Sequence, residues 1–220
     1  EHATPVILLT DAFIANGTGA FKVPEISGMD AINPPYVTGE MKGSWTPYMR
    51  NPETGSRYLA TPGKEGFEHV TGSLEKSNET GDISGDPENH QLMTNLRAEK
   101  VARIPVPDLK VEGVEKDADL LIVGFGGTYG HLHSAFDELT AKGEKVAFAH
   151  LSYLNPLPKN TAEVLRNHKK VVVAELNNGQ LAAYLRMNVE GVHINQYNQV
   201  TGQPFNVGKL VEAFENLIHA

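Results

Sequence analysis

The sequence contains no cysteine among its 220 residues. This absence excludes disulfide bonds, cysteine-ligated zinc and cysteine-ligated iron–sulfur clusters within the chain. Any electron transfer through such a cluster would therefore take place on another part of the protein or on another subunit.

Two other features are missing. No hydrophobic run is as long as a bilayer-spanning helix, and no block of Lys and Arg forms a basic face in a chain with a formal net charge of -8. We therefore expect neither a membrane nor a nucleic acid as a partner, and infer a cytoplasmic protein. The apolar content of 40% is enough for a real core.

The N-terminal third lacks regular periodicity. Residues 6–10 read as one short strand, followed by turn signals at 11–19, and one strand cannot make a domain. From 38 to 89 Gly, Pro, Thr, Ser, Asn and charged residues dominate. Such a long irregular segment is either a functional excursion or a linker, and its aromatic residues favour the excursion. The chain begins with Glu1, so a piece of a longer protein and a processed full-length protein are both possible.

Asp86-Pro87-Glu88 predicts the start of a helix that runs to about Arg103, with a capping residue, a proline and an acid in the expected order. Residues 104–113 read as extended. The sequence thus divides into residues 1–30, an irregular connecting segment with one helix at 31–114, and a domain at 115–220.

The domain alternates strands and helices. It predicts strands at 118–124, 145–150, 171–174 and 192–196, and helices at 128–142, 161–167, 179–187 and 207–219. This order implies right-handed crossovers and an α/β fold with three αβα layers and a mostly parallel sheet.

The third of these strands runs directly into a cluster of polar residues. Val171 to Ala174 form a continuous apolar run, which suits a strand buried on both faces, and Glu175, Asn177, Asn178 and Gln180 follow at its carboxyl end. Open α/β sheets place ligands at that end. A capped turn into the next helix is the other interpretation, and the residues alone do not decide between them.

Gly124-Phe-Gly-Gly-Thr-Tyr-Gly130 lies between a strand and a helix, where backbone N–H groups could approach an anion. A tight strand-to-helix turn is the simpler interpretation. The next strand ends in Ala149-His150-Leu151 without a carboxylate for a ribose, so we exclude a dinucleotide site.

The remaining candidates for chemistry are few. His131 and His133 lie one residue apart on a helix and point in different directions, so we expect no metal site. Arg57 lies in the irregular segment, where it is either a surface residue or a fork-shaped donor for a substrate carboxylate. Asp11 is more typical of a turn than of an acid catalyst.

Taken in order, these segments resemble the C-terminal part of the α subunit of 2-oxoacid:ferredoxin oxidoreductases, most of all the 2-oxoglutarate type. The resemblance covers nearly the whole chain. It is carried by Pro5-Val-Ile-Leu-Leu-Thr-Asp11, Gly55-Ser-Arg57, Pro62-Gly63, Thr71-Gly72, Asp86-Pro87-Glu88-Asn-His90, Arg97 with Lys100, the Gly124 loop and Glu175-Leu-Asn-Asn-Gly-Gln180.

The resemblance implies that residues 1–30 are the trailing strand of a pyrimidine-binding domain and that 115–220 resemble the transketolase C-terminal domain. It implies an enzyme that oxidatively decarboxylates a 2-oxoacid to an acyl-coenzyme A and passes electrons to ferredoxin. Thiamine diphosphate, magnesium and an iron–sulfur cluster would belong to the whole enzyme, with the cluster in a β subunit. We expect none of them on this chain alone.

The resemblance also assigns roles to residues. Arg57 and Thr71 would contact the substrate, whereas Glu175, Asn177 and Gln180 would brace a turn or a subunit contact. No catalytic residue is expected in this part, which would be inactive by itself and would assemble with the β subunit into an oligomer.

Two alternatives remain open. An independent small α/β module could bind an anion or nucleotide at the loop of residues 124–130. A purely structural domain could use Glu175, Asn177 and Gln180 across a subunit boundary.

Overall fold

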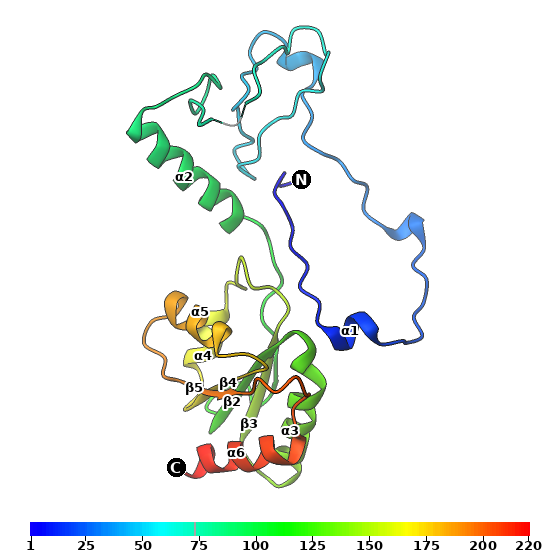
Figure 1. Ribbon diagram of the computed structural model, residues 1–220, viewed down its shortest axis with the longest axis vertical. Helices are drawn as coiled ribbons and strands as arrows, with labels where there is room; N and C mark the ends of the chain where they lie inside the picture. The colour runs from blue at the N-terminus through cyan, green and yellow to red at the C-terminus, as the bar shows by residue number, and fades with distance from the viewer. Residues whose placement is uncertain (73) are drawn as a thin grey trace. The chain divides into compact units, whose positions relative to one another are not determined.

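The computed structural model describes residues 1–72 and 74–220, without the side chains of Phe13 and Ile14. It divides the chain into two compact units (Figure 1). Unit 1 comprises Glu1–Ile7 and Ala20–Pro105, and unit 2 comprises Leu8–Gly19 and Val106–Ala220.

Unit 2 is built on one five-stranded sheet in the order β1-β3-β2-β4-β5. Strand β1 pairs antiparallel with β3, and all other pairs are parallel. The strands are β1 Val111–Gly113, β2 Leu120–Phe125, β3 Val146–Leu151, β4 Val171–Glu175 and β5 Ile194–Asn198. The predicted mostly parallel α/β sheet is confirmed.

Helices cover both faces of this sheet (Figure 1). Leu120 and Ile122 of β2 pack with buried residues of α3 (Tyr129–Ala141) and α6 (Val207–His219). The alternate residues Leu121 and Val123 pack on the opposite side with α4 (Thr161–Arg166) and α5 (Gln180–Asn188). Because successive strand residues face opposite layers, a strand between two helical layers is apolar on both faces, as β2 is and as β4 is from Val171 to Ala174.

Strand β1 differs from the prediction. Val111–Gly113 reads in sequence as the end of an extended connecting segment, yet it forms an edge strand against β3. Gly113 has a φ of +83°, and a Cβ there would lie 2.7 Å from both the Phe136 ring and the Val146 carbonyl oxygen. Three residues are too few to show a two-residue period, which explains why no pairing signal is visible in the sequence.

The strand predicted at residues 6–10 does not form. Val6 to Leu9 are extended and exposed and belong to no sheet, and the short helix α1 (Ala12–Asn16) follows where turn signals had suggested a turn. A strand is stable only in a hydrogen-bonded ladder, and the described residues offer this segment no partner strand.

Helix α2 (Pro87–Ala102) in unit 1 begins as predicted. The Asp86 carboxylate accepts a hydrogen bond of 3.0 Å from the Glu88 N–H, and Pro87 occupies the first turn. Met93 is its one buried residue, so this helix makes little contact with a core in the described chain.

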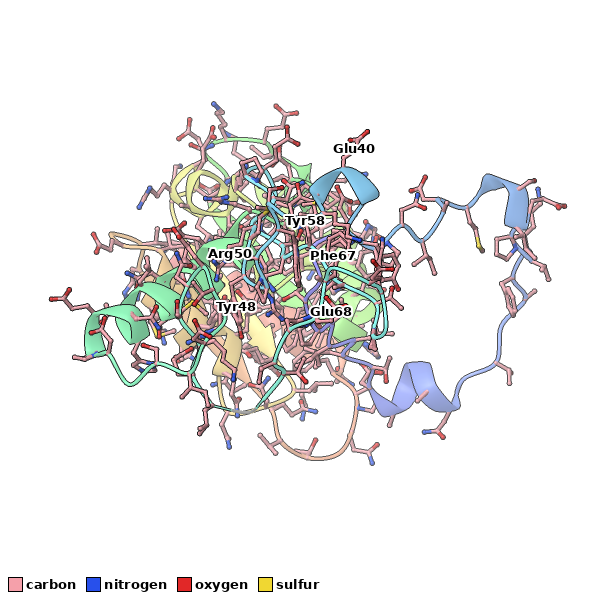
Figure 2. All side chains as sticks on the ribbon, turned by 90° about the horizontal axis from the view of Figure 1, so that it is seen from above. Glu40, Tyr48, Arg50, Tyr58, Phe67 and Glu68 are labelled. Carbon is pink, nitrogen blue, oxygen red and sulfur yellow. The ribbon has the colours of Figure 1, made fainter. Side chains whose placement is uncertain are left out.

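The irregular segment before α2 folds through turns and side-chain packing. Besides the turns η1 (Ile26–Gly28) and η2 (Gly39–Met41), it contains isolated bridges that join Tyr36 to Leu59, Arg50 to Arg57 and Lys76 to Ile83. The Trp45 and Phe67 rings meet edge to face at 5.6 Å. Figure 2 shows the labelled Tyr48, Arg50, Tyr58 and Phe67 gathered in this part of the chain.

None of the helices that the described residues form combines the length and the apolar character needed to cross a bilayer.

Candidate functional site

The polar cluster after β4 is occupied with the start of helix α5. Glu175 is fully buried, and its two carboxylate oxygens accept hydrogen bonds from the N–H groups of Leu181 (2.7 Å) and Ala182 (2.9 Å). The side-chain oxygen of Asn177 accepts from the N–H groups of Gly179 and Gln180. A carboxylate at a helix N-terminus satisfies free donors and interacts favourably with the helix dipole. These contacts favour the capped turn over a ligand site.

Unlike Glu175 and Asn177, Gln180 has an exposed side chain that makes no hydrogen bond to any described residue. It remains available for a contact outside this chain.

The glycine-rich loop after β2 faces an internal carboxylate. Residues Gly126–Thr128 form the turn η3, and Thr128 donates a hydrogen bond from its hydroxyl to the Phe125 carbonyl at 2.7 Å. The Asp11 carboxylate lies directly against Gly127, where any Cβ would collide with it. The place where an external anion would approach the start of α3 is therefore next to a negative charge of the same unit, which disfavours the anion-binding alternative.

The described histidines form ion pairs with at most two acidic residues each. His133 contacts Glu112 and Asp137, each at 3.1 Å, as a surface pair. No group of three or more His, Cys, Asp or Glu side chains within residues 1–72 and 74–220 is arranged to hold a metal ion.

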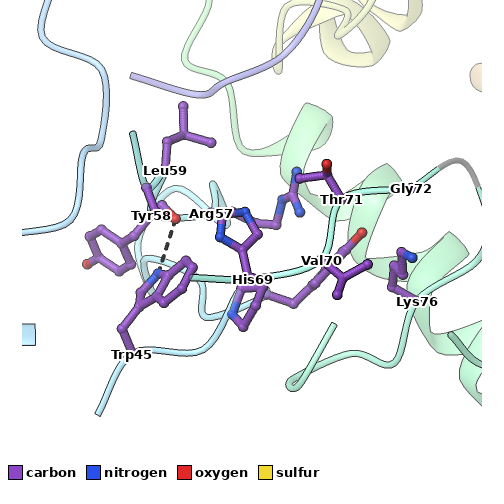
Figure 3. A pocket seen from close by; sticks show the side chains of 12 residues that line it. Trp45, Arg57, Tyr58, Leu59, His69, Val70, Thr71, Gly72 and Lys76 are labelled. Atoms are coloured by element: carbon purple, nitrogen blue, oxygen red, sulfur yellow. Dashed lines mark hydrogen bonds between the residues drawn. The ribbon is translucent and has the colours of Figure 1, made fainter. Parts of the chain in front are cut away.

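A pocket in unit 1 brings together the two residues to which the family resemblance assigns a substrate contact. Arg57 and Thr71 both line a cavity of about 240 Å³ in the irregular segment (Figure 3). Trp45, Tyr58 and Leu59 form one side in the view of Figure 3, and Lys76 lies on the other, beyond His69 and Thr71. The complete lining is Trp45, Pro47, Tyr48, Arg57, Tyr58, Leu59, Ala60, His69, Val70, Thr71, Gly72 and Lys76.

Hydrogen bonds and aromatic contacts within the irregular segment fix the walls of this pocket. The Tyr58 N–H donates to the Met49 carbonyl, and the indole N–H of Trp45 donates to the Tyr58 carbonyl at 3.2 Å. His69 packs edge to face on Trp45 at 5.1 Å, and its Nδ1 lies 2.9 Å from the Phe67 carbonyl oxygen. An irregular segment thus acquires a defined cavity through aromatic contacts rather than through a sheet or helix.

Arg57 presents a cation that no side chain in the described part of the chain neutralises. Its guanidinium stacks on the Tyr48 ring at 4.4 Å from the ring centroid, and it makes no hydrogen bond or ion pair with any described residue. The neighbouring Arg50, in contrast, donates to the carbonyls of Tyr48 and Asn78, both at 3.1 Å. Arg50 therefore holds the segment together, whereas the fork of Arg57 is available to a ligand.

The area around Arg57 is electropositive. Burial lowers the pKa of Arg50, and the charge of Arg57 lowers it further. Burial likewise lowers the pKa of Lys100, with the charges of Arg57 and Arg50 adding to the effect. Repulsion of this kind is what an anion would relieve.

Lys76 is a pocket residue that the sequence reasoning missed. It is only 2% exposed, yet its Nζ has no hydrogen-bond partner among the described residues. It is also the nearest group to Gly72, where a Cβ would lie 3.1 Å from Nζ. No sequence signal marks it, because a lysine among Glu75, Ser77 and Asn78 reads as an ordinary polar turn.

The acid beside Lys76 faces other partners. Glu75 accepts from His90 at 2.7 Å and from Arg97 at 3.3 Å, and these contacts, the His90 hydrogen bond first, lower the pKa of its carboxyl. None of the residues that line the pocket is an Asp or a Glu. The pocket is therefore lined by two cations, a hydroxyl and aromatic rings, a combination that suits a small anion.

Comparison with known proteins gives a consistent picture. Residues 118–210 match the family described as pyruvate:ferredoxin oxidoreductase core domain II. The chain is 44% identical over 217 residues to the 2-oxoglutarate oxidoreductase subunit KorA of Mycobacterium tuberculosis, covering 97% of this chain and 33% of that protein. It is 27% identical to the α subunit of 2-oxoacid:ferredoxin oxidoreductase 1 of Aeropyrum pernix, covering 97% and 34%.

A solved structure agrees with these relatives. The 2-oxoglutarate:ferredoxin oxidoreductase from Magnetococcus marinus, described with 2-oxoglutarate, coenzyme A and succinyl-CoA bound, matches with a TM-score of 0.79 and 30% identity. The match covers 89% of this chain and 34% of that one. The resemblance that the sequence indicates is thus confirmed, and the chain spans about a third of the length of the curated relatives it matches.

Proposed function

We propose that this chain, related along nearly its whole length to α subunits of 2-oxoacid:ferredoxin oxidoreductases, is the C-terminal part of such a subunit. In the whole enzyme, a 2-oxoacid, in our proposal 2-oxoglutarate, is oxidatively decarboxylated to an acyl-coenzyme A, with electrons passed to ferredoxin. The part of the subunit described here contributes one wall of the substrate site and supports assembly, and it is inactive alone.

One observation carries the substrate assignment. Arg57 and Thr71 come from separate stretches of an irregular segment, yet they line one cavity that contains no acidic side chain. A guanidinium without a carboxylate partner has the planar, forked geometry that binds a carboxylate through two hydrogen bonds. We assign the carboxylate of the 2-oxoacid to Arg57, with the Thr71 hydroxyl as a further hydrogen-bond donor.

The cofactors belong to the rest of the enzyme in this proposal. Thiamine diphosphate would supply the electron sink for decarboxylation, aided by magnesium, and an iron–sulfur cluster would carry the electrons. Because the chain has no cysteine, a cysteine-ligated cluster would be held by a partner, which we propose is the β subunit. Ferredoxin and coenzyme A would bind to the complex.

We further propose two contacts with the rest of the oligomer. The exposed apolar residues Val6 to Leu9 would pair with the sheet of a pyrimidine-binding domain, because unpaired backbone groups of an apolar strand favour pairing. Exposed Gln180 would bond across a subunit boundary, whereas Glu175 and Asn177 hold the turn beneath it. A cytoplasmic location stays a prediction from the sequence, which cell fractionation tests.

The test uses the full reading frame that contains this chain, produced together with the β subunit. We expect 2-oxoglutarate-dependent and coenzyme A-dependent reduction of ferredoxin, and no thiamine diphosphate binding by the isolated chain in calorimetry. Tight binding of that cofactor by the isolated chain would show that it is not a fragment of this kind.

Arg57→Lys then tests the site within the complex. Lysine keeps the charge but loses the fork, so we expect KM for 2-oxoglutarate to rise about tenfold or more. Arg103→Lys is the matched control, because Arg103 forms a surface pair with Glu99 and does not line the pocket. An unchanged KM in Arg57→Lys would remove Arg57 from the substrate site.

A further inference from the structure

Lys76 is the feature of the pocket that the proposed function leaves unexplained. It is 2% exposed, and its ammonium group has no hydrogen bond or ion pair within the described chain. The side chain is buried as a whole, but its ammonium group is accessible at the pocket, where an anionic group of a ligand can reach it. A second anionic group in the pocket would provide the missing partner.

The two cationic side chains that line the pocket favour a ligand with two anionic groups. Arg57 and Lys76 both line it, and no lining residue is acidic. The nearest acid in sequence, Glu75, is hydrogen-bonded to His90 and Arg97. A ligand with one carboxylate would compensate only one of the two cations.

The size and walls of the pocket indicate the rest of the ligand. A cavity of about 240 Å³ is below the range of roughly 300–1,000 Å³ of sites for drug-sized molecules, so it suits a small metabolite and not a coenzyme. Leu59, Ala60 and Val70 also line it, and their apolar side chains suit a short methylene chain.

We propose that Lys76 is a specificity-determining residue that binds the distal carboxylate of a dicarboxylic 2-oxoacid while Arg57 binds the carboxylate next to the oxo group. This inference rests on the proposed function and deepens it. It explains in one arrangement why two cations line a pocket without acids, and why neither of them has an acidic partner among the described residues.

The experiment compares two substrates in the complete enzyme. We measure KM and kcat for 2-oxoglutarate, which has two carboxylates, and for 2-oxobutyrate, which has one, in the wild type and in Lys76→Met. Methionine is apolar and of similar length, so it should fill the space of the buried lysine stem and leave the fold intact. Lys76→Gln replaces it if the methionine variant does not assemble, and Lys42→Met, which removes an exposed cation outside the pocket, is the control.

In Lys76→Met we expect KM for 2-oxoglutarate to rise about 10- to 100-fold, the effect of losing one hydrogen-bonded charge, with KM for 2-oxobutyrate within about twofold. Lys76→Arg should restore most of the preference. An unchanged ratio between the two substrates overturns the inference, and so does an equal rise for both, which would mean that Lys76 binds the shared carboxylate. A wild-type complex that oxidises neither substrate overturns the proposed function itself, and the inference with it.

Discussion

Glu175 offers a sharp test of how the domain holds the turn after β4. Its buried carboxylate accepts hydrogen bonds from the N–H groups of Leu181 and Ala182 at 2.7 and 2.9 Å. In Glu175→Ala both donors lose their acceptor inside the protein. Glu175→Gln keeps one carbonyl oxygen for one of them and turns an amide group toward the other.

The expected loss of stability follows from these two hydrogen bonds. A buried donor left without a partner costs about 1–3 kcal/mol, and two of them give about 2–6 kcal/mol for Glu175→Ala. Glu175→Gln should cost about half of that. Because about 1.4 kcal/mol corresponds to a factor of ten, local opening of the first turn of α5 should become at least ~30-fold more frequent in the alanine variant.

Hydrogen exchange, measured by mass spectrometry on the peptide that contains residues 180–188, reports this opening directly. Unfolding in urea gives the total decrease in the free energy of unfolding. Glu163→Ala is the control, because Glu163 lies in the first turn of α4 but is exposed. If Glu175→Ala exchanged and unfolded like the wild type, the assignment of Glu175 to the helix start would be wrong.

Three further outcomes follow. Burial lowers the pKa of His168 below its ordinary value near 6.5, so the unfolded chain binds the proton more readily than the folded one. The free energy of unfolding should therefore fall as the pH drops below about 6.5, and His168→Gln should flatten that dependence in urea titrations. Gly113→Ala should lower the melting temperature more than Gly143→Ala, because both glycines have positive φ but only Gly113 lacks space for a Cβ; equal shifts would contradict the observed packing of β1. Asp86→Ala should destabilise α2 by about 1 kcal/mol and Asp86→Asn by little, as circular dichroism during thermal unfolding can check.

The sequence predicted those parts of the fold that depend on neighbouring residues in the chain. The apolar runs of β2 and β4 identify strands buried on both faces, and Asp86-Pro87 identifies the start of α2. Strand β1 was missed because its pairing with β3 depends on the space that Gly113 leaves beside Phe136, a tertiary feature. The strand expected at residues 6–10 needs a partner that the described residues do not supply.

The site could be predicted only in part. Arg57 and Thr71 came from a family resemblance, and no periodic pattern in the irregular segment indicates that they share a pocket. Lys76 gave no signal, because its low exposure and its place in the pocket arise only when the irregular segment is folded, with Nζ beside Gly72. Charge compensation of that kind is visible only in three dimensions.

The most direct measurement is a crystal structure of the complete α and β complex soaked with 2-oxoglutarate. We expect density for the ligand in the pocket of Figure 3, with one carboxylate on the Arg57 guanidinium and the other on the Lys76 ammonium. Density for 2-oxoglutarate elsewhere in the complex, with neither cation in contact with it, would contradict the proposed roles of Arg57 and Lys76.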